Sequence, residues 1–192
     1  MDSWVENLEN LMKSYGMAVR EQLKAQGLND DLILQTDERW ANEIYGWGTD
    51  ATVGNNACAI ASLAMINAYW QHTPLTINQV LNWAGNDYFT DAGTLWSIFP
   101  AFAEKYGYKY KDLGTNVADA LPYLKNNVPV LISVKPGRFT TVGHIMVLTH
   151  ADDEYIRLLD PNDNENKNHA LTSFSKEVIQ KELRHIWVFI GE

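Results

Sequence analysis

The sequence has a single cysteine, few basic residues and no long apolar run, and each shortage excludes a class of protein. Cys58 has no partner for an internal disulfide, which is typical of proteins kept in a reducing compartment. The 15 lysines and arginines are outnumbered by 24 acidic residues, and they form no cluster that would follow a phosphate backbone. No apolar run reaches the length of a membrane span. We therefore expect neither a nucleic acid partner nor insertion into a membrane.

The N-terminus also lacks the basic start and apolar centre of a signal peptide. As encoded, the chain is predicted to stay in the cytoplasm, with release only through lysis or a phage. Its 192 residues are 46% apolar, which is enough for one core of ordinary size. We predict one domain over residues 31–192, preceded by an N-terminal extension over residues 1–30.

The extension is predicted to be one amphipathic helix that ends at Gly27. Its apolar side chains recur at helical spacing, at Val5, Leu8, Leu11, Met12, Tyr15, Val19 and Leu23. We expect this helix to pack on the domain. The alternative is an arm that binds a protein partner or inhibits the site.

Within the domain, helical patterns come mostly first and strand patterns second. Helices are predicted over residues 55–71, 76–83, 94–106, 116–125 and 174–183. Short β-rich runs predict strands over residues 128–134, 144–150, 155–159 and 185–190. Because the loops between the middle runs are short, these strands should be antiparallel neighbours. The predicted fold class is therefore α+β, with a helical half packed on an antiparallel sheet.

Cys58 lies at the head of the most apolar of these helices, whose composition suits a helix buried in a core. Asn55 and Asn56 are natural N-caps, so Cys58 falls in the first turn. There the unpaired backbone N–H groups and the helix dipole favour the thiolate, which is the nucleophilic form of cysteine. The alternative is that Cys58 is a small buried apolar residue, as most free cysteines are.

A cysteine nucleophile needs a base within hydrogen-bond reach, usually from a remote part of the chain. Among the five histidines, His144 is favoured because it follows Gly143 at the head of a strand, where an imidazole is both fixed and exposed. His150 ends the same strand. The remaining three are interpreted as surface or capping residues: His72, His169 and His185.

Two further residues extend this hypothesis. Asp160 ends the strand that we expect beside that of His144, so its carboxylate would orient the imidazole and stabilise its charged form. The alternative is that Asp160 and Pro161 only form a turn. Gln35 reaches the cysteine helix through a glycine- and aromatic-rich loop, and its amide would donate to an oxyanion beside the backbone N–H of Cys58.

The order of these residues resembles a known family. Gln-x-Asp-x-x-Trp, then Ala-Cys, then Gly-His-x-x-Val-Leu, then Leu-Asp-Pro-Asn is similar to papain-like cysteine peptidases of the bacteriocin-processing (double-glycine) type, in their stand-alone bacterial and phage relatives. The resemblance covers about residues 32–189 and implies a papain-like fold. The roles that it implies are Cys58 as nucleophile, His144 as base, Asp160 as orienting residue and Gln35 in the oxyanion hole. One departure is Ala57-Cys58-Ala59-Ile60, where relatives commonly have Gly-Cys-Gly-Pro.

We expect no metal and no cofactor. Oxygen-bearing side chains alternate from Asp160 to Asn166, as they do in a calcium loop. The pattern lacks glycine at its sixth position, however, and has Leu171 at the twelfth, where such a loop needs glutamate. With one cysteine and scattered histidines, a zinc site is disfavoured further.

Three hypotheses for function follow. The first is a cysteine hydrolase that cleaves an amide bond of a peptide through a thioester. The second keeps this chemistry and changes the substrate to the stem peptides of peptidoglycan, which makes the chain an amidase or endopeptidase. The third is a catalytically idle peptidase fold that binds a partner through the N-terminal helix, and the substitutions around Cys58 motivate it.

Overall fold

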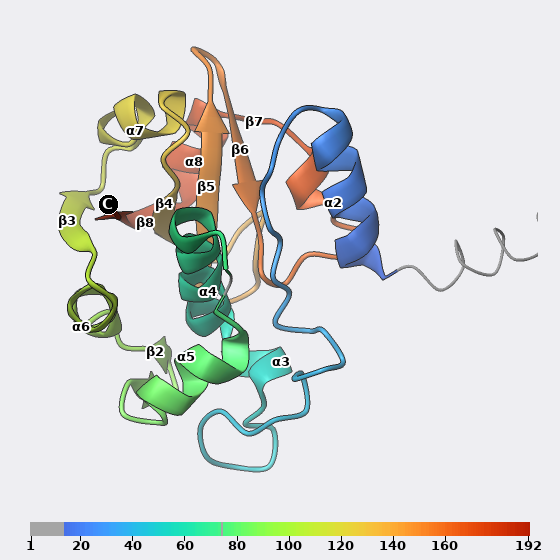
Figure 1. The fold of residues 1–192 in the computed structure, drawn as a ribbon, viewed down its shortest axis with the longest axis vertical. Coiled ribbons are helices and arrows are strands. Elements are labelled where there is room, and N and C mark those ends of the chain that lie inside the picture. The colour runs from blue at the N-terminus through green and yellow to red at the C-terminus, as the bar shows by residue number, and fades with distance from the viewer. Residues whose placement is uncertain (1–13, 74) are drawn as a thin grey trace, which may run out of the picture.

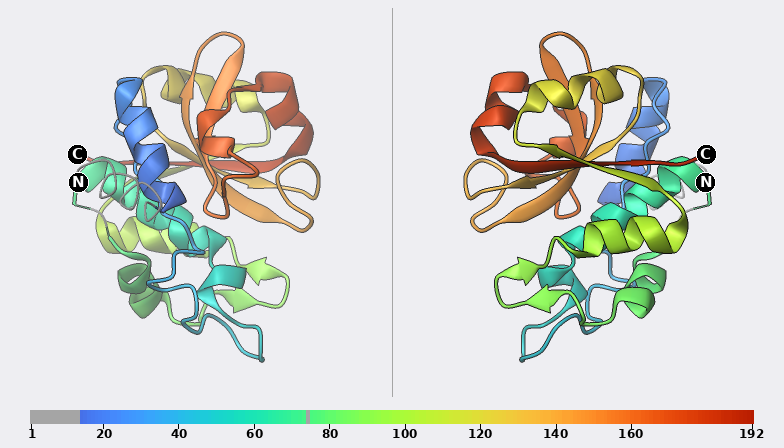
Figure 2. Two further views of the ribbon diagram at one scale, coloured as in Figure 1. Left: turned by 90° about the vertical axis from the view of Figure 1, so that its right-hand side faces the viewer. Right: turned by 90° about the vertical axis from the view of Figure 1, so that its left-hand side faces the viewer.

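A computed structural model describes residues 14–73 and 75–192 as a mixed fold of helices and sheet (Figure 1). In both views of Figure 2 helices α3, α5 and α6 lie below the large sheet, with α4 at the boundary, whereas α2 stands beside the strands. The predicted α+β class is confirmed. No described helix is long and apolar enough to span a bilayer. The described α-helices are α2 (Tyr15–Ala25), α3 (Val53–Asn56), α4 (Cys58–Gln71), α5 (Ile77–Ala84), α6 (Ile98–Tyr106), α7 (Leu121–Lys125) and α8 (Lys176–Glu182).

Six strands form one antiparallel sheet in the order β3-β8-β4-β5-β6-β7. The four strands predicted from β-rich runs correspond to β4, β5, β6 and β8, and the antiparallel pairing of the middle ones is confirmed. The edge strands β3 and β7 are additions, as is a separate two-residue hairpin, β1 and β2. The strand bounds are β1 (Phe89–Thr90), β2 (Gly93–Thr94), β3 (Lys109–Gly114), β4 (Val130–Val134), β5 (His144–Ala151), β6 (Tyr155–Leu159), β7 (Phe174–Ser175) and β8 (Leu183–Ile190).

The sheet is buried on both faces, because side chains of its central strands alternate between two apolar clusters. Leu131 and Ile145 belong to the cluster that contains α4. Their neighbours Ile132 and Met146 belong to the cluster that contains residues of α7 and α8. Coverage of both faces explains why the strand runs in the sequence are continuously apolar.

The helix that carries Cys58 is the central element of the core. Every residue of α4 from Ala59 to Ala68 is buried. The hydroxyl of Ser62, one turn into the helix, donates to the backbone oxygen of Ile145 on β5 at 3.3 Å. This contact aligns the start of α4 with the start of β5, so Cys58 and His144 lie at the same end of the two elements.

The predicted capping of α4 is wrong, although the predicted position of the thiol is right. Asn55 and Asn56 belong to the short helix α3, which Thr52 caps through its hydroxyl. Their side-chain amides donate to backbone oxygens of the preceding loop instead. Cys58 is nevertheless the first residue of α4, at the end where the backbone N–H groups have no acceptor within the helix.

The other predicted helices are present with adjusted bounds. Thr76 caps α5 in a capping box with Gln79, as its sequence predicts. The helix expected from Thr94 begins only at Ile98, because Thr94 pairs with Phe89 in the β1–β2 hairpin. The segment expected from residue 116 to 125 divides into a 3₁₀ turn, η1 (Val117–Asp119), and α7.

The described part of the N-terminal helix is α2, and it packs on the domain. Val19 and Leu23 are buried in the same cluster as α4. The chain leaves the helix at Gly27, whose φ of 79° is a conformation that glycine adopts without strain. The predicted apolar positions from Val5 to Met12 lie outside the described residues.

Candidate active site

Three side chains from separate elements meet at the N-terminal end of α4. The thiol of Cys58 and the imidazole of His144 lie side by side, close enough for each to shift the pKa of the other. On the far side of the ring, His144 Nε2 lies 2.6 Å from Oδ1 of Asp160, which is completely buried just after β6. Because Asp160 engages Nε2, Nδ1 is the nitrogen left for the thiol. The arrangement has the geometry of a nucleophile, a base and an orienting carboxylate.

The electrostatics of these three groups favour a charged pair at the thiol. Burial raises the pKa of Cys58, but His144 together with the backbone of Ile145 and Ala59 lowers it by more, so the thiol pKa lies below its ordinary value. Burial lowers the pKa of His144, whereas its bonds to Asp160 and Cys58 raise the pKa to about 10. Burial raises the pKa of Asp160, but its imidazole partners bring it well below the usual range. A thiolate beside an imidazolium is therefore the favoured state near neutral pH.

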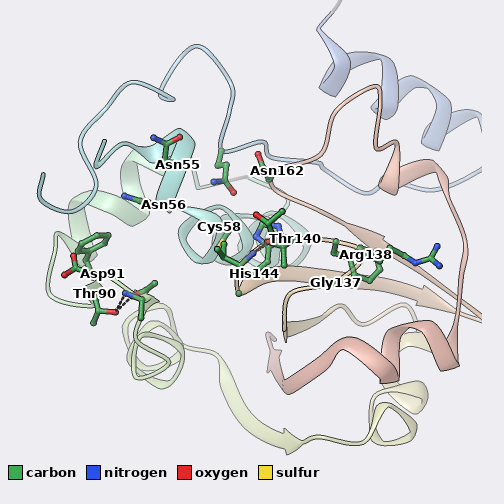
Figure 3. Close-up of a pocket in the computed structure, with 18 of the residues that line it drawn as sticks. Asn55, Asn56, Cys58, Thr90, Asp91, Gly137, Arg138, Thr140, His144 and Asn162 are labelled. Atoms are coloured by element: carbon green, nitrogen blue, oxygen red, sulfur yellow. Dashed lines mark hydrogen bonds between the residues drawn. The ribbon is translucent and has the colours of Figure 1, made fainter. Parts of the chain in front are cut away.

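A cavity of about 540 Å³ opens onto Cys58 and His144 (Figure 3). Cys58 is half-buried and lies in its floor. The β1–β2 hairpin forms one wall with Asp91, and the β4–β5 loop forms another with Arg138. The thiol thus lies between the β1–β2 hairpin and the β4–β5 loop. Its other polar lining residues are Gln35, Asn55, Asn56, Thr90, Thr140, Thr141, Asn162 and Lys167.

Gln35 lies in the wall of the same cavity and is 3% exposed. Its backbone N–H donates to the carbonyl of Pro161 at 2.8 Å, which anchors it next to Asp160. Its side-chain Nε2 donates one hydrogen to the backbone oxygen of Gly54 at 2.9 Å, and the amide carries a second hydrogen for another acceptor. Oε1 is buried and has no donor among the described residues. The oxyanion role of Gln35 stays a prediction.

His169 is a member of the site that sequence reasoning missed. It was expected at the surface, but it is 8% exposed and its Nδ1 lies 2.8 Å from Oδ2 of Asp160. The surface prediction is wrong because Asp163 folds the loop inward by accepting hydrogen bonds from the backbone of the 3₁₀ turn η2 (His169–Leu171). The competing His150 lies toward the other end of β5, where its Nε2 is 2.7 Å from Asp30.

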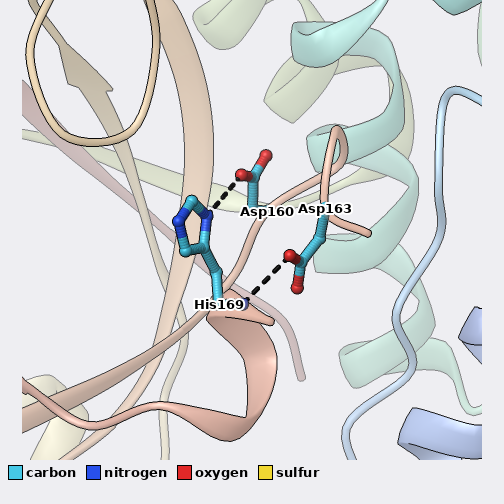
Figure 4. A group of neighbouring side chains, drawn as sticks. All are labelled: Asp160, Asp163 and His169. Carbon is cyan, nitrogen blue, oxygen red and sulfur yellow. Dashed lines mark hydrogen bonds and ion pairs between the residues drawn. The ribbon is translucent and has the colours of Figure 1, made fainter. Parts of the chain in front are cut away.

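Asp160, Asp163 and His169 also lie close enough to be compared with a metal site, since one ligand atom of each falls within 4.8 Å of the others (Figure 4). Hydrogen bonds already account for this grouping. Asp160 accepts from both imidazoles and from the backbone N–H of Asn162. Asp163 accepts from backbone N–H groups and from the hydroxyl of Tyr15. Each carboxylate oxygen of the group has a donor, so we assign no metal to it.

Two solved structures show the same fold at low sequence identity. The peptidase domain of Streptococcus ComA, a bi-functional ABC transporter involved in a quorum sensing pathway, is 18% identical with a TM-score of 0.55, over 70% of this chain and 91% of that one. The peptidase domain of Streptococcus mutans ComA is 15% identical with a TM-score of 0.50, over 78% of this chain and 99% of that one. At these identities the likeness shows the fold alone.

Comparison with curated proteins gives no significant match. Residues 31–190, by contrast, match the sequence profile described as the Peptidase_C39 like family. The match spans the whole of the candidate site, from Gln35 to His169. It agrees with the resemblance to bacteriocin-processing peptidases drawn from the residue order. The chain therefore belongs to the Peptidase_C39 like family.

Proposed function

We propose that this chain is a cysteine peptidase that hydrolyses peptide bonds through a thioester intermediate. The observation that carries the proposal is the arrangement of Cys58 beside His144, which is hydrogen-bonded to buried Asp160, with a cavity that opens onto the thiol. Membership of a peptidase family supports the reaction class.

The geometry suits a two-stage reaction. The Cys58 thiolate attacks the carbonyl carbon, the C–S bond forms, and the carbonyl oxygen becomes an oxyanion. His144 then gives its proton to the nitrogen of the leaving amine as the C–N bond breaks and the thioester remains. In the second stage neutral His144 takes a proton from water, whose oxygen attacks the thioester. The C–S bond breaks, the acid is released, and the thiolate–imidazolium pair is restored.

The substitutions around Cys58 give no support to the hypothesis of a catalytically idle binding protein. Ala57 and Ala59 are fully buried in the core, and neither lines the cavity. Ala57 has a φ of −97°, which any L-residue adopts. The added methyl groups therefore leave the approach to the thiol open.

The substrate class is tested by incubating the purified protein with a panel of peptides and, separately, with peptidoglycan. New amino termini in the peptides would support the proposal. Release of muropeptides without any peptide cleavage would favour the peptidoglycan hypothesis instead. A Cys58→Ala sample processed in parallel controls for contaminating peptidases.

The alkylation rate of Cys58 should depend on pH as that of an activated thiol does. Because its pKa lies below the ordinary value, the thiolate persists at pH values where a free thiol with a pKa of about 8.5 is protonated. The imidazolium of His144 is lost only as the pH rises through about 10. Iodoacetamide labelling measured against pH by mass spectrometry should therefore show fast reaction at pH values below those at which an ordinary thiol reacts.

His144→Ala is the control for that profile, since it removes the side chain that lowers the thiol pKa. We expect its reaction rate to rise only near the pKa of an ordinary cysteine. A wild type that reacts no differently from His144→Ala would refute the activated pair and count against the peptidase proposal.

Gln35→Ala should lower kcat by about 10- to 1000-fold, the scale of losing one oxyanion donor, while KM changes little. The thiol should keep its alkylation profile, because Gln35 is not among the groups that shift the thiol pKa. If Gln35 only braces the loop through Gly54, its loss would instead lower the melting temperature and leave turnover per folded molecule nearly intact. Measuring kcat and melting temperature on the same sample separates the two roles.

A further inference from the structure

The orienting carboxylate of the proposed active site is shared between two imidazoles. Oδ1 of Asp160 accepts from His144 Nε2 at 2.6 Å and from the backbone N–H of Asn162 at 2.8 Å. Oδ2 accepts from His169 Nδ1 at 2.8 Å (Figure 4). An ionised carboxylate can only accept, so His169 must carry a proton on Nδ1. A second histidine thus donates to the oxygen of the carboxylate that His144 does not use.

The ring of His169 is held firmly enough to impose an orientation. Its backbone N–H donates to Oδ1 of Asp163 at 3.0 Å. Two phenylalanine rings contact its faces and edges, with centroids 5.3 Å away at Phe139 and 5.8 Å away at Phe174. The ring therefore has little freedom to rotate away from Asp160.

The N-terminal helix also stabilises the loop that carries His169. The hydroxyl of Tyr15 on α2 donates to Oδ2 of Asp163 at 3.0 Å, and the backbone N–H of Ala170 donates to the same oxygen at 2.9 Å. Tyr15 precedes the residues that match the family profile. The segment that presents His169 is consequently fixed from both sides.

A carboxylate held only through Oδ1 could rotate about its terminal torsion, which is a soft coordinate for aspartate. Its second oxygen would then be buried without a donor, at the cost of that group's desolvation. A donor on Oδ2 removes both problems and keeps Oδ1 directed at His144. The imidazole of His144 is in turn kept in the tautomer that leaves Nδ1 for the thiol.

We propose that His169 is a positioning residue that fixes the plane of the Asp160 carboxylate and, through it, the orientation of His144. This inference rests on the proposed peptidase function. The titratable groups near the carboxylate are His144 from β5, His169 from η2, Asp163 from the loop between β6 and η2, and Tyr15 from α2. Arg157 and Lys167 donate to backbone oxygens of Ala170 and Asn162 instead.

Two variants of His169 distinguish a positioning role from a packing role, because each variant keeps one of the two and removes the other. His169→Phe keeps an aromatic ring between Phe139 and Phe174 but removes the donor. His169→Asn loses the ring but places its amide nitrogen as many bonds from the backbone as Nδ1. His185→Asn is the matched control, since His185 also forms an imidazole–carboxylate pair, 2.6 Å from Asp112, at the edge of the sheet.

With the best peptide of the panel, His169→Phe should lower kcat by about 10- to 100-fold with little change in KM, the scale of one lost hydrogen bond to a charged group. His169→Asn and the control should stay close to the wild type in kcat. An active His169→Phe beside an impaired His169→Asn would show that the ring only packs, and would overturn the inference. If His169→Phe does not fold, His169→Asn decides alone, and a folded variant with tenfold lower kcat contradicts positioning.

Alkylation of Cys58 distinguishes failure of this inference from failure of the proposed function, because it needs no substrate. His169→Phe should move the pH profile of iodoacetamide labelling toward that of an ordinary thiol, and His169→Asn should not. An absence of peptide cleavage by the wild type would reject the peptidase proposal, whereas an unchanged profile in His169→Phe would reject the positioning role.

Discussion

Cys58→Ala is expected to lose all measurable turnover while folding as the wild type does. The side chain supplies the only nucleophile of the proposed reaction, so its removal prevents formation of the thioester. Its loss should disturb the fold little, because Cys58 is half-buried at the end of α4 and the residues that pack this helix follow it. The measurement is product formation per folded molecule, with circular dichroism and melting temperature on the same sample.

Cys58→Ser is the companion variant, since it keeps a hydrogen-bonding group at the same position. A serine hydroxyl beside His144 is not ionised at neutral pH, so the charged pair that the thiol forms is lost. We expect its activity to fall close to that of Cys58→Ala. Cleavage by Cys58→Ala at the wild-type rate would mean that another group is the nucleophile.

The grouping of Cys58, His144 and Asp160 could be predicted largely because cysteine and histidine are rare in this sequence. The single cysteine limits the choice of nucleophile, and Gly143 before His144 marks one histidine of five as a residue at the head of a strand. The strand order then follows from short connections, which make β5 and β6 antiparallel neighbours. With Asp160 at the end of β6, its meeting with His144 at the start of β5 is a consequence of that pairing.

His169 could not be placed in this way because its burial depends on contacts remote in sequence. Its loop contains several asparagines, which favour turns. The sequence does not indicate that the hydroxyl of Tyr15 donates a hydrogen bond to Asp163 in this loop. One local signal was present: Ala170 and Leu171 directly after it are apolar, which is unusual for an exposed loop.

The strand β3 was missed for a related reason. Its sequence, Lys-Tyr-Lys-Asp-Leu-Gly, is largely polar because β3 is an edge strand that pairs only with β8 and is at most half-buried. Edge strands commonly carry lysine and other charged side chains. Hydrophobic periodicity therefore finds the central strands of this sheet and not its edge.

Asp160 supplies a negative charge next to His144 and also fixes the orientation of its ring. Two variants of Asp160 should separate these two contributions. Asp160→Ala should lower kcat by about 10⁴-fold, the scale of removing the orienting member of a comparable triad. It leaves the ring N–H groups of His144 and His169 buried without their acceptor, so the melting temperature should fall as well.

Asp160→Asn should retain much more activity than Asp160→Ala, because the backbone N–H of Asn162 selects one orientation of the new amide. That N–H donates to the atom that also accepts from His144, so the amide oxygen must occupy this position and the NH₂ group must face His169. His169 can accept there by moving its proton from Nδ1 to Nε2, whereas His144 keeps the tautomer that serves the thiol.

The charge of the carboxylate is still lost in Asp160→Asn, so the imidazolium of His144 is stabilised less and its pKa falls from about 10. The pH range in which the charged pair exists should therefore narrow from its alkaline side, and a pH profile of kcat/KM measures this directly. Equal losses in the two variants would contradict the role of Asn162 and show that charge, not orientation, is what Asp160 contributes. A folded Asp160→Ala variant with near-normal kcat would remove the carboxylate from the mechanism altogether.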